Sequence, residues 1–275
     1  QKYSYKNQGD VGMSGYFNGT YYKHQKGTNT LCIIAGHCSS KKFIQVITKD
    51  FSVEVPFTKE NIFTRKGIRL NISTPEISLK GTIKYGILSP IRYDIMGPFC
   101  LFPMECRHGI TSMYHRLKGR VVLNGQTMDF TGGIGYMEKD SGRSFPSSYA
   151  WIQANDFSNH TSIMASVAEI PFCGLRFRGC ICVIQYQGKE YRLATYLGVH
   201  VVVCRPDRIV LKQRKYRLDI RINNNNQRKL SAPKNGEMTR KIMESASCEA
   251  EFTFYRHKKQ VFHLKSEQAS FEYEG

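Results

Sequence analysis

The stretch KYRLDIRI, residues 215–222, decides the fold class. Charged side chains occupy its odd-numbered positions, whereas the even-numbered positions hold Tyr216, Leu218, Ile220 and Ile222. In an extended chain successive side chains point to opposite faces, so this segment has one apolar and one charged face. We therefore predict a β-strand here, within a longer run over residues 208–222.

The same period of two residues recurs along most of the chain. Two short runs flank Lys49-Asp50 within residues 43–55, and further runs lie at residues 68–72, 79–88, 120–130, 163–170, 177–186, 191–203, 249–255 and 260–264. Many short strands separated by turn residues are typical of antiparallel sandwiches or barrels. The sequence predicts an all-β protein with few short helices, one of which we expect over residues 239–246.

The domain organisation is predicted from the longest stretch without strand periodicity, residues 89–118. A structureless connection of that length is uncommon inside a compact domain and is usually functional. The 275 residues suffice for one large domain or two modest ones. We expect two consecutive β domains, residues 1–117 and 118–275.

The charge balance is strongly basic, with 40 Lys and Arg against 22 Asp and Glu and a net charge of +18. On strands such as 215–222 the basic residues alternate with apolar ones, so they are expected to cover the solvent faces of a sheet. We expect no nucleic-acid partner. The open alternatives are an ordinary basic surface and loose association with an anionic membrane, where each nearby Lys or Arg contributes about 1 kcal/mol.

The nine cysteines include no Cys-x-x-Cys pair, so neither a structural zinc site nor a thioredoxin-like redox site is expected. Cys180 and Cys182 are two residues apart in an apolar run and are predicted to be small buried hydrophobes. This usage fits a reducing cytoplasm. No secretory signal is visible, and no apolar run reaches the roughly 18 residues of a membrane helix. We expect neither a metal nor a cofactor.

Two segments, residues 95–115 and 132–157, break the strand pattern and concentrate chemically active side chains. Glu138 and Asp140 are two residues apart, so both point to one face of an extended segment. Carboxyl groups that close share a proton, which raises the pKa of one of them. Arg143 would hold the other ionised. The alternative is a salt-bridge cluster at the end of a strand.

A rival acid is Glu105, although Arg107 two residues later would make a structural ion pair with it. Cys106 and His108 match neither a thiol dyad of known spacing nor a full metal site.

The two segments together resemble the tocopherol cyclase-like family, most densely in residues 95–115 and 132–196, which end with Arg192-Leu193-Ala194-Thr195-Tyr196. The resemblance implies a relationship to carotenoid hydratase-like proteins and a pair of lipocalin-like β-barrels. It also implies a cofactor-free reaction: the side-chain alkene of a prenylated hydroquinone is protonated, and the phenol oxygen captures the cation to close a chroman ring.

That chemistry implies roles for further residues. A strong acid must be desolvated, which favours Glu138 or Asp140 with support from Arg143 and His108. A carbocation needs an aromatic lining, as other cations do. His108 and His115 would orient the hydroquinone or remove its phenolic proton. We expect the substrate to contact a set of mostly aromatic and amide side chains, namely Tyr136, Trp151, Gln153, Asn155, Phe157, His115 and Tyr196. For each aromatic residue the alternative is packing in the core.

The sequence departs from the family pattern at three positions. The signature Phe-Glu-Gly-Trp-Tyr reads Phe17-Asn18-Gly19-Thr20-Tyr21, and Ser141 replaces the Trp that usually follows Glu-Lys-Asp. These changes keep open a non-catalytic protein that binds lipids or other hydrophobic small molecules on the same fold. A third alternative is a basic protein that acts at membrane surfaces. The oligomeric state stays open.

Overall fold

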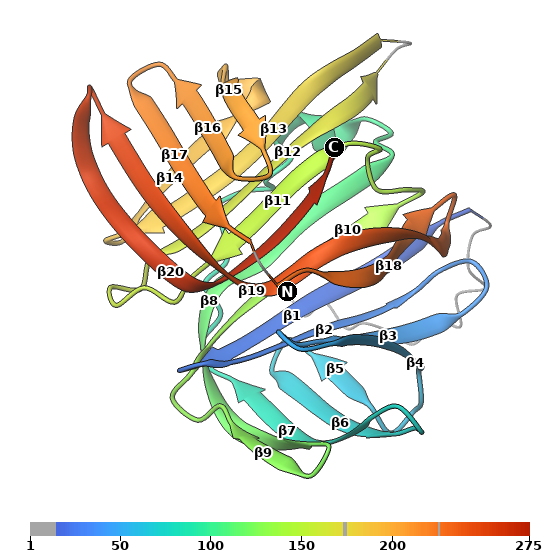
Figure 1. Ribbon diagram of the computed structural model, residues 1–275. Helices are drawn as coiled ribbons and strands as arrows, with labels where there is room; N and C mark the ends of the chain where they lie inside the picture. The colour runs from blue at the N-terminus through green and yellow to red at the C-terminus, as the bar shows by residue number, and fades with distance from the viewer. Residues whose placement is uncertain (1–14, 173–174, 225) are drawn as a thin grey trace, which may run out of the picture.

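The computed structural model describes residues 15–172, 175–224 and 226–275. This part of the chain folds almost entirely into antiparallel strands, which confirms the all-β prediction (Figure 1). The strands form two ten-stranded sheets, one from each half of the chain. The described residues contain two short 3₁₀ helices, η1 (Gly97–Leu101) and η2 (Thr195–Leu197). None of the described helices has the length and apolar character needed to cross a membrane.

The first sheet has the strand order β4-β3-β2-β1-β10-β8-β7-β6-β5, and β9 pairs with β8 outside this path. Its strands are β1 (Phe17–Lys26), β2 (Asn29–His37), β3 (Lys42–Ile47), β4 (Ser52–Pro56), β5 (Ile62–Thr64), β6 (Gly67–Ser73), β7 (Ser78–Tyr85), β8 (Cys106–Leu123), β9 (Gln126–Asp129) and β10 (Ile134–Gly142).

The second sheet has the order β14-β13-β12-β11-β20-β19-β17-β16-β15, and β18 pairs with β19. Its strands are β11 (Tyr149–Ala154), β12 (Ser162–Phe172), β13 (Leu175–Tyr186), β14 (Lys189–Ala194), β15 (His200–Arg205), β16 (Arg208–Gln213), β17 (Tyr216–Asn223), β18 (Arg228–Lys234), β19 (Glu237–Arg256) and β20 (Lys259–Glu274).

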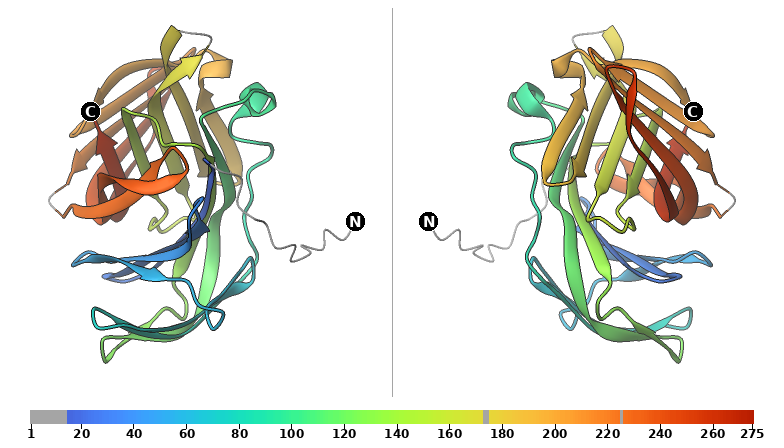
Figure 2. Two further views of the ribbon diagram at one scale, coloured as in Figure 1. Left: turned by 90° about the vertical axis from the view of Figure 1, so that its right-hand side faces the viewer. Right: turned by 90° about the vertical axis from the view of Figure 1, so that its left-hand side faces the viewer.

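The two sheets repeat one topology. In each half the first four strands form consecutive hairpins, and the first strand, β1 or β11, then pairs with the last strand, β10 or β20. Each sheet curls around its own core, and the two halves stack one above the other (Figures 1 and 2). This arrangement agrees with the predicted pair of lipocalin-like units.

The change from one half to the other falls later than the expected boundary at residues 117/118. Strand β8 runs through that position because its buried residues Met113, Leu117 and Val121 continue one apolar face. The first sheet ends at Gly142 and the second begins at Tyr149. The segment 86–105 therefore connects β7 to β8 within the first half and does not link the halves.

The helix expected over residues 239–246 is wrong, because this segment belongs to β19. It pairs with β18 through Arg240↔Ala232 and with β20 through Glu244↔Glu272. Partners on both sides satisfy the backbone, so tertiary pairing overrides the local preference for helix.

Three large cores and one small cluster around Phe17, Cys38 and Phe43 stabilise the described fold. One lies inside the first half around Leu31, Ile44 and Val121, and one lies inside the second half around Phe252 and Phe254. The third lies between the halves and contains side chains from both.

Cys180 and Cys182 are buried in the second half, as predicted. All cysteines in the described part of the chain are free, and Cys173 lies outside it.

Candidate functional site

The first strands of the two halves, β1 and β11, meet face to face along a seam. Side chains two residues apart share a face of each strand, and three pairs result: Tyr21 with Trp151, Lys23 with Gln153, and Gln25 with Asn155. The ring centroids of the first pair are 5.5 Å apart. Lys23 Nζ donates to Gln153 Oε1 at 3.1 Å, and Gln25 Nε2 donates to Asn155 Oδ1 at 3.0 Å.

A cleft opens between the halves beside the Trp151 end of this seam. Its volume is about 120 Å³. Its walls are mostly apolar and aromatic and include Phe99, Phe145, Trp151 and Phe177. Its polar lining is dominated by acidic groups and His108; the residues concerned are Glu105, His108, Glu138, Asp140, Glu169 and Glu272.

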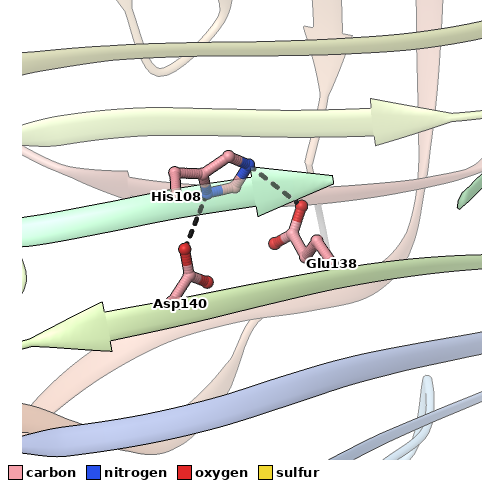
Figure 3. Close-up of side chains that lie close together, drawn as sticks. All are labelled: His108, Glu138 and Asp140. Carbon is pink, nitrogen blue, oxygen red and sulfur yellow. Dashed lines mark ion pairs between the residues drawn. The ribbon is translucent and has the colours of Figure 1, made fainter. Parts of the chain in front are cut away.

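His108 on β8 lies between two carboxyl groups of β10 (Figure 3). Its Nδ1 is 2.7 Å from Asp140 Oδ1 and its Nε2 is 3.3 Å from Glu138 Oε2. The antiparallel register places His108 directly opposite Asp140. Because β10 alternates its side chains, Glu138 then falls on the same face. His108 Nε2 and Asp140 Oδ1 make no hydrogen bond of good geometry within the described chain, so these contacts are ion pairs by distance.

The charge state of this row follows from burial and neighbouring charge. Burial lowers the pKa of His108, but the adjacent Asp140 and Glu138 outweigh it and raise that pKa well above its ordinary value. The two carboxyl groups therefore favour the imidazolium form of His108. Burial raises the pKa of Glu138, while His108 opposes this shift and Asp140 adds to it.

Tyr136 fixes the orientation of Glu138. Its hydroxyl donates to Glu138 Oε2 at 2.5 Å, and His108 contacts the same oxygen. Oε1 is therefore the oxygen left to carry an acidic proton.

A second acidic pair lies on the wall contributed by the second half. Tyr149 Oη donates to Glu272 Oε2 at 2.6 Å, and both residues line the cleft. Burial, and next the neighbouring Glu244, raise the pKa of Glu272.

Glu244 of β19 lies directly opposite Glu272 of β20 and is fully buried. Neither of its carboxyl oxygens has a hydrogen-bond partner among the described residues. Burial is the main reason that its pKa rises to about 8.

His108, Glu138 and Asp140 also form a group that could hold a metal ion, with one ligand atom from each within 4.8 Å of the others. However, the two carboxyl groups face different nitrogens of one imidazole. A single ion would have to displace one of these contacts, so the geometry favours a proton-carrying row over a chelating set.

The structure brings together five of the residues predicted for the site. Glu105, His108, Glu138, Asp140 and Trp151 line the cleft, and Tyr136 supports Glu138 from behind. Glu105 is exposed, and among the described residues it makes no ion pair with Arg107. Arg107 donates instead to the Cys100 carbonyl.

Arg143 does not have its expected role. Strand β10 ends at Gly142, and the Arg143 side chain is exposed and forms no ion pair in the described structure. His108, and not Arg143, is the basic residue beside the carboxyl groups of Glu138 and Asp140.

The other expected substrate contacts lie outside the cleft. Gln153 and Asn155 belong to the seam, and Phe157 packs on Phe252 in the second core. His115 Nδ1 is 3.0 Å from Ser112 Oγ, and its ring packs against Tyr85. Tyr196 donates to the Ile95 carbonyl and its ring lies against Gly97, so it supports the 86–105 segment from outside.

The three departures from the family signature lie away from the cleft lining. Asn18 and Thr20 share a face of β1 with Tyr22, which packs in the core of the first half. Ser141 lies opposite Asn18 in the neighbouring strand. These changes therefore alter neither the His108 row nor the walls of the cleft.

Sequence reasoning missed Glu272, Tyr149 and Glu244. Glu244 fell in the segment misassigned as helix, and Glu272 lies near the end of the chain, in a strand that the expected run at residues 260–264 did not reach. The one usable signal was the spacing Glu272-Tyr273-Glu274, which matches Glu138-Lys139-Asp140.

Comparison with known proteins gives a family and a fold. The family model described as tocopherol cyclase-like matches residues 32–275. No curated protein sequence gives a significant match. Kievitone hydratase from Nectria haematococca has a similar fold, with a TM-score of 0.55 and 10% identity over 94% of this chain and 88% of that chain. CghA, solved with Sch210972, gives a TM-score of 0.60 at 8% identity with the same coverage.

Proposed function

This chain belongs to the tocopherol cyclase-like family, and from that premise we propose that it is a lipid-modifying enzyme in which Glu138 protonates an amphipathic aromatic substrate. The observation that carries the proposal is the buried row Asp140–His108–Glu138 on the wall of an apolar cleft. Such a row stores a proton in a place where little water competes for it.

Glu138 rather than Asp140 is the donor because His108 neutralises Asp140 more closely. The His108–Asp140 contact is 2.7 Å, against 3.3 Å to Glu138. Only 6% of the Glu138 side chain is exposed, against 18% for Asp140. The deeper and less compensated carboxyl group is the one that stays protonated.

The proposed reaction is the ring closure of a prenylated hydroquinone. The O–H bond of Glu138 breaks as a C–H bond forms at the alkene, which leaves a tertiary carbocation beside the rings of Trp151 and Phe99. The phenol oxygen then forms the C–O bond of a chroman and loses its proton to a base. Aromatic rings attract a cation through their quadrupole. The scheme requires no cofactor.

The size of the cleft sets the part of the substrate that it holds. Its volume, about 120 Å³, resembles that of a cavity that holds a benzene-sized molecule and lies below the several hundred Å³ typical of drug-sized ligands. The aromatic head and the reacting alkene would lie inside, and the remaining chain would extend past the exposed Glu105 at the mouth.

The test is incubation with a prenylated hydroquinone, followed by chromatography and mass spectrometry for a chroman of unchanged mass. We expect turnover in the wild type and a loss of at least about 100-fold in Glu138→Gln. The matched control is Glu267→Gln, because Glu267 is exposed and does not line the cleft. Equal turnover in Glu138→Gln and the control would refute the role of Glu138. Tight binding without turnover in the wild type would support the alternative, a non-catalytic lipid-binding protein.

A further inference from the structure

We propose that Glu272 is a second acid–base residue of this cleft, on the half opposite Glu138, and that it accepts the proton lost by the substrate hydroxyl. The inference deepens the proposed function and rests on it.

The repeated topology makes the two glutamates equivalent. In the first half Tyr21 of β1 lies directly opposite Glu138 of β10. In the second half Trp151 of β11 lies directly opposite Glu272 of β20. Tyr21 and Trp151 are themselves partners across the seam. Glu138 and Glu272 therefore occupy matching positions beside the same aromatic pair.

The immediate surroundings of the glutamates match as well. Each accepts a hydrogen bond from a buried tyrosine: Tyr136 donates to Glu138 at 2.5 Å and Tyr149 donates to Glu272 at 2.6 Å. Two residues further along each strand, a second carboxyl group is paired with a cation. In the first half this pair is Asp140 with His108, and in the second it is Glu274 with Arg240 at 3.2 Å. The second half thus holds an acid of the same construction.

The cleft also contains a donor without a partner, which points to a ligand at this wall. Trp151 lines the cleft beside Glu272, and its indole Nε1 is buried with no hydrogen-bond partner among the described residues. Buried donors in native structures nearly always have an acceptor. A substrate oxygen near Glu272 would supply one.

The two glutamates of the cleft have separate roles in proton transfer. Glu138 and Asp140 oppose the ionisation of Glu272, and burial makes Glu138 itself hard to ionise. The two glutamates together therefore carry less than two negative charges. The protonated Glu138 gives its proton to the alkene carbon. Glu272 in its ionised form takes the proton of the phenol as the phenol oxygen bonds to the cation, and because burial raises the pKa of Glu272, this form becomes more abundant as the pH rises. The proton then returns to Glu138, so the reaction consumes none.

The two roles are separated by an experiment in D₂O with two probes. The first probe is a prenylated hydroquinone, in which ring closure is measured. The second is the same compound methylated on the hydroxyl beside the prenyl chain, which cannot close. With this ether, Glu138 delivers deuterium to the alkene and takes a proton back from the cation, so deuterium accumulates in the side chain without any role for Glu272.

We expect Glu272→Gln to lower ring closure at least about 100-fold and to leave deuterium uptake by the ether within about threefold. Glu138→Gln should lower both, and Glu267→Gln should lower neither. Loss of both reactions, or of neither, in a folded Glu272→Gln protein overturns the role of Glu272. If the wild type shows neither reaction, the proposed function itself fails.

Tyr149→Phe provides an independent test, because it keeps the ring that packs against Phe145 and removes the donor to Glu272. The tyrosine hydroxyl stabilises the ionised form, so its loss should raise the pKa of Glu272 further. Ring closure needs that ionised form, so its rise with pH should move to higher pH, whereas the pH profile of deuterium uptake should stay in place. An unchanged ring-closure profile would contradict the assignment.

Discussion

At the scale of single residues, the row Asp140–His108–Glu138 combines the spacing along one strand with the register between two strands. The two-residue separation of Glu138 and Asp140 was enough to place both carboxyl groups on one face. The partner, however, comes from a strand 30 residues earlier, and only the register of β8 against β10 places His108 there. Arg143 looked equally suitable in sequence, but it follows Gly142, where β10 ends.

The buried acids make stability depend on pH. The pKa of Glu244 rises from 4.5 to about 8 in the folded protein, chiefly because of burial. A carboxyl group with a raised folded pKa binds more protons in the folded than in the unfolded state between those values. Its stabilising contribution is therefore complete below about pH 4.5 and is lost as the pH rises through about 8. The raised pKa values of Glu138 and Glu272 act in the same direction.

We expect the free energy of unfolding, measured with urea at a series of pH values, to fall between pH 4.5 and 8 less steeply in Glu244→Gln than in the wild type. The glutamine keeps the volume and cannot ionise. Glu267→Gln should retain the wild-type slope. Identical slopes for all three proteins would show that Glu244 ionises normally in the fold.

A second residue-scale prediction concerns the charge between the carboxyl groups. In His108→Gln the side chain still reaches toward Asp140 but carries no positive charge. Glu138 then loses the counter-charge of His108, so its pKa should rise further. We expect ring closure to decrease at least about 100-fold at neutral pH, with the residual activity surviving to higher pH than in the wild type. A pH profile of the same shape and position would contradict the counter-charge role.

At the scale of elements, strands were predictable where one face is apolar, whereas the position of the 86–105 segment between β7 and β8 was not. The alternation in residues 215–222 reappears as β17, and the runs around Lys49-Asp50 reappear as β3 and β4. The misassigned β19 has polar residues at buried positions, such as Glu244 and Ser245, so its alternation is hidden. The 86–105 segment has no period at all, and its place over the cleft depends on contacts with the second half.

Gly97 is one such contact. Its φ is +54°, and a Cβ there would lie 2.6 Å from the ring of Tyr196. Gly125 provides a matched control, because its φ is +84° and nothing lies within 4 Å of a Cβ there. We expect Gly125→Ala to cost about 1 kcal/mol through backbone strain alone. Gly97→Ala should cost roughly 1–3 kcal/mol more, because the methyl group must displace the ring.

Thermal or urea unfolding measures this difference, and Gly97→Ala combined with Tyr196→Ala should recover part of the loss. If the two alanine variants are equally stable, Gly97 is not held against Tyr196.

At the scale of the whole molecule, the all-β class and the two-part organisation were predictable, and the boundary between the parts was not. A polar, aperiodic segment signals a break in strand order but not which strands it separates. The 86–105 segment ends inside the first half, whereas the link between the halves, residues 143–148, is too short to be conspicuous. The repeat of the two halves is likewise visible only in strand order and register.

The net charge of +18 and the exposed Leu101 on η1 lead to a prediction about membranes. η1 stands out from the body of the molecule (Figure 2), and its residue Phe99 lines the cleft. We propose that this end approaches anionic bilayers, and we expect binding to phosphatidylserine vesicles in a sedimentation assay that weakens as salt rises, because exposed charges are screened over about 10 Å at 0.1 M.

Leu101→Ser should weaken that binding severalfold, because Leu101 is 83% exposed and would enter the interface. Val122→Ser is the control, since Val122 is 41% exposed on β8 next to the hairpin with β9. Binding that is absent, or that does not change with salt, would exclude the proposed attraction.

The seam between β1 and β11 has a consequence for how molecules enter and leave. A hinge motion that separates the halves would break the hydrogen bonds from the buried Lys23 ammonium to Gln153 and to the Gln268 carbonyl. The ammonium would then have no acceptors, which would cost a free energy of several kcal/mol. The short stretch 97–105 has fewer such ties and already forms part of the cleft wall. Substrate and product are therefore expected to enter and leave beneath residues 97–105 while the two halves stay in contact. The width of this opening, more than the volume of the cleft, would then determine which head groups are admitted.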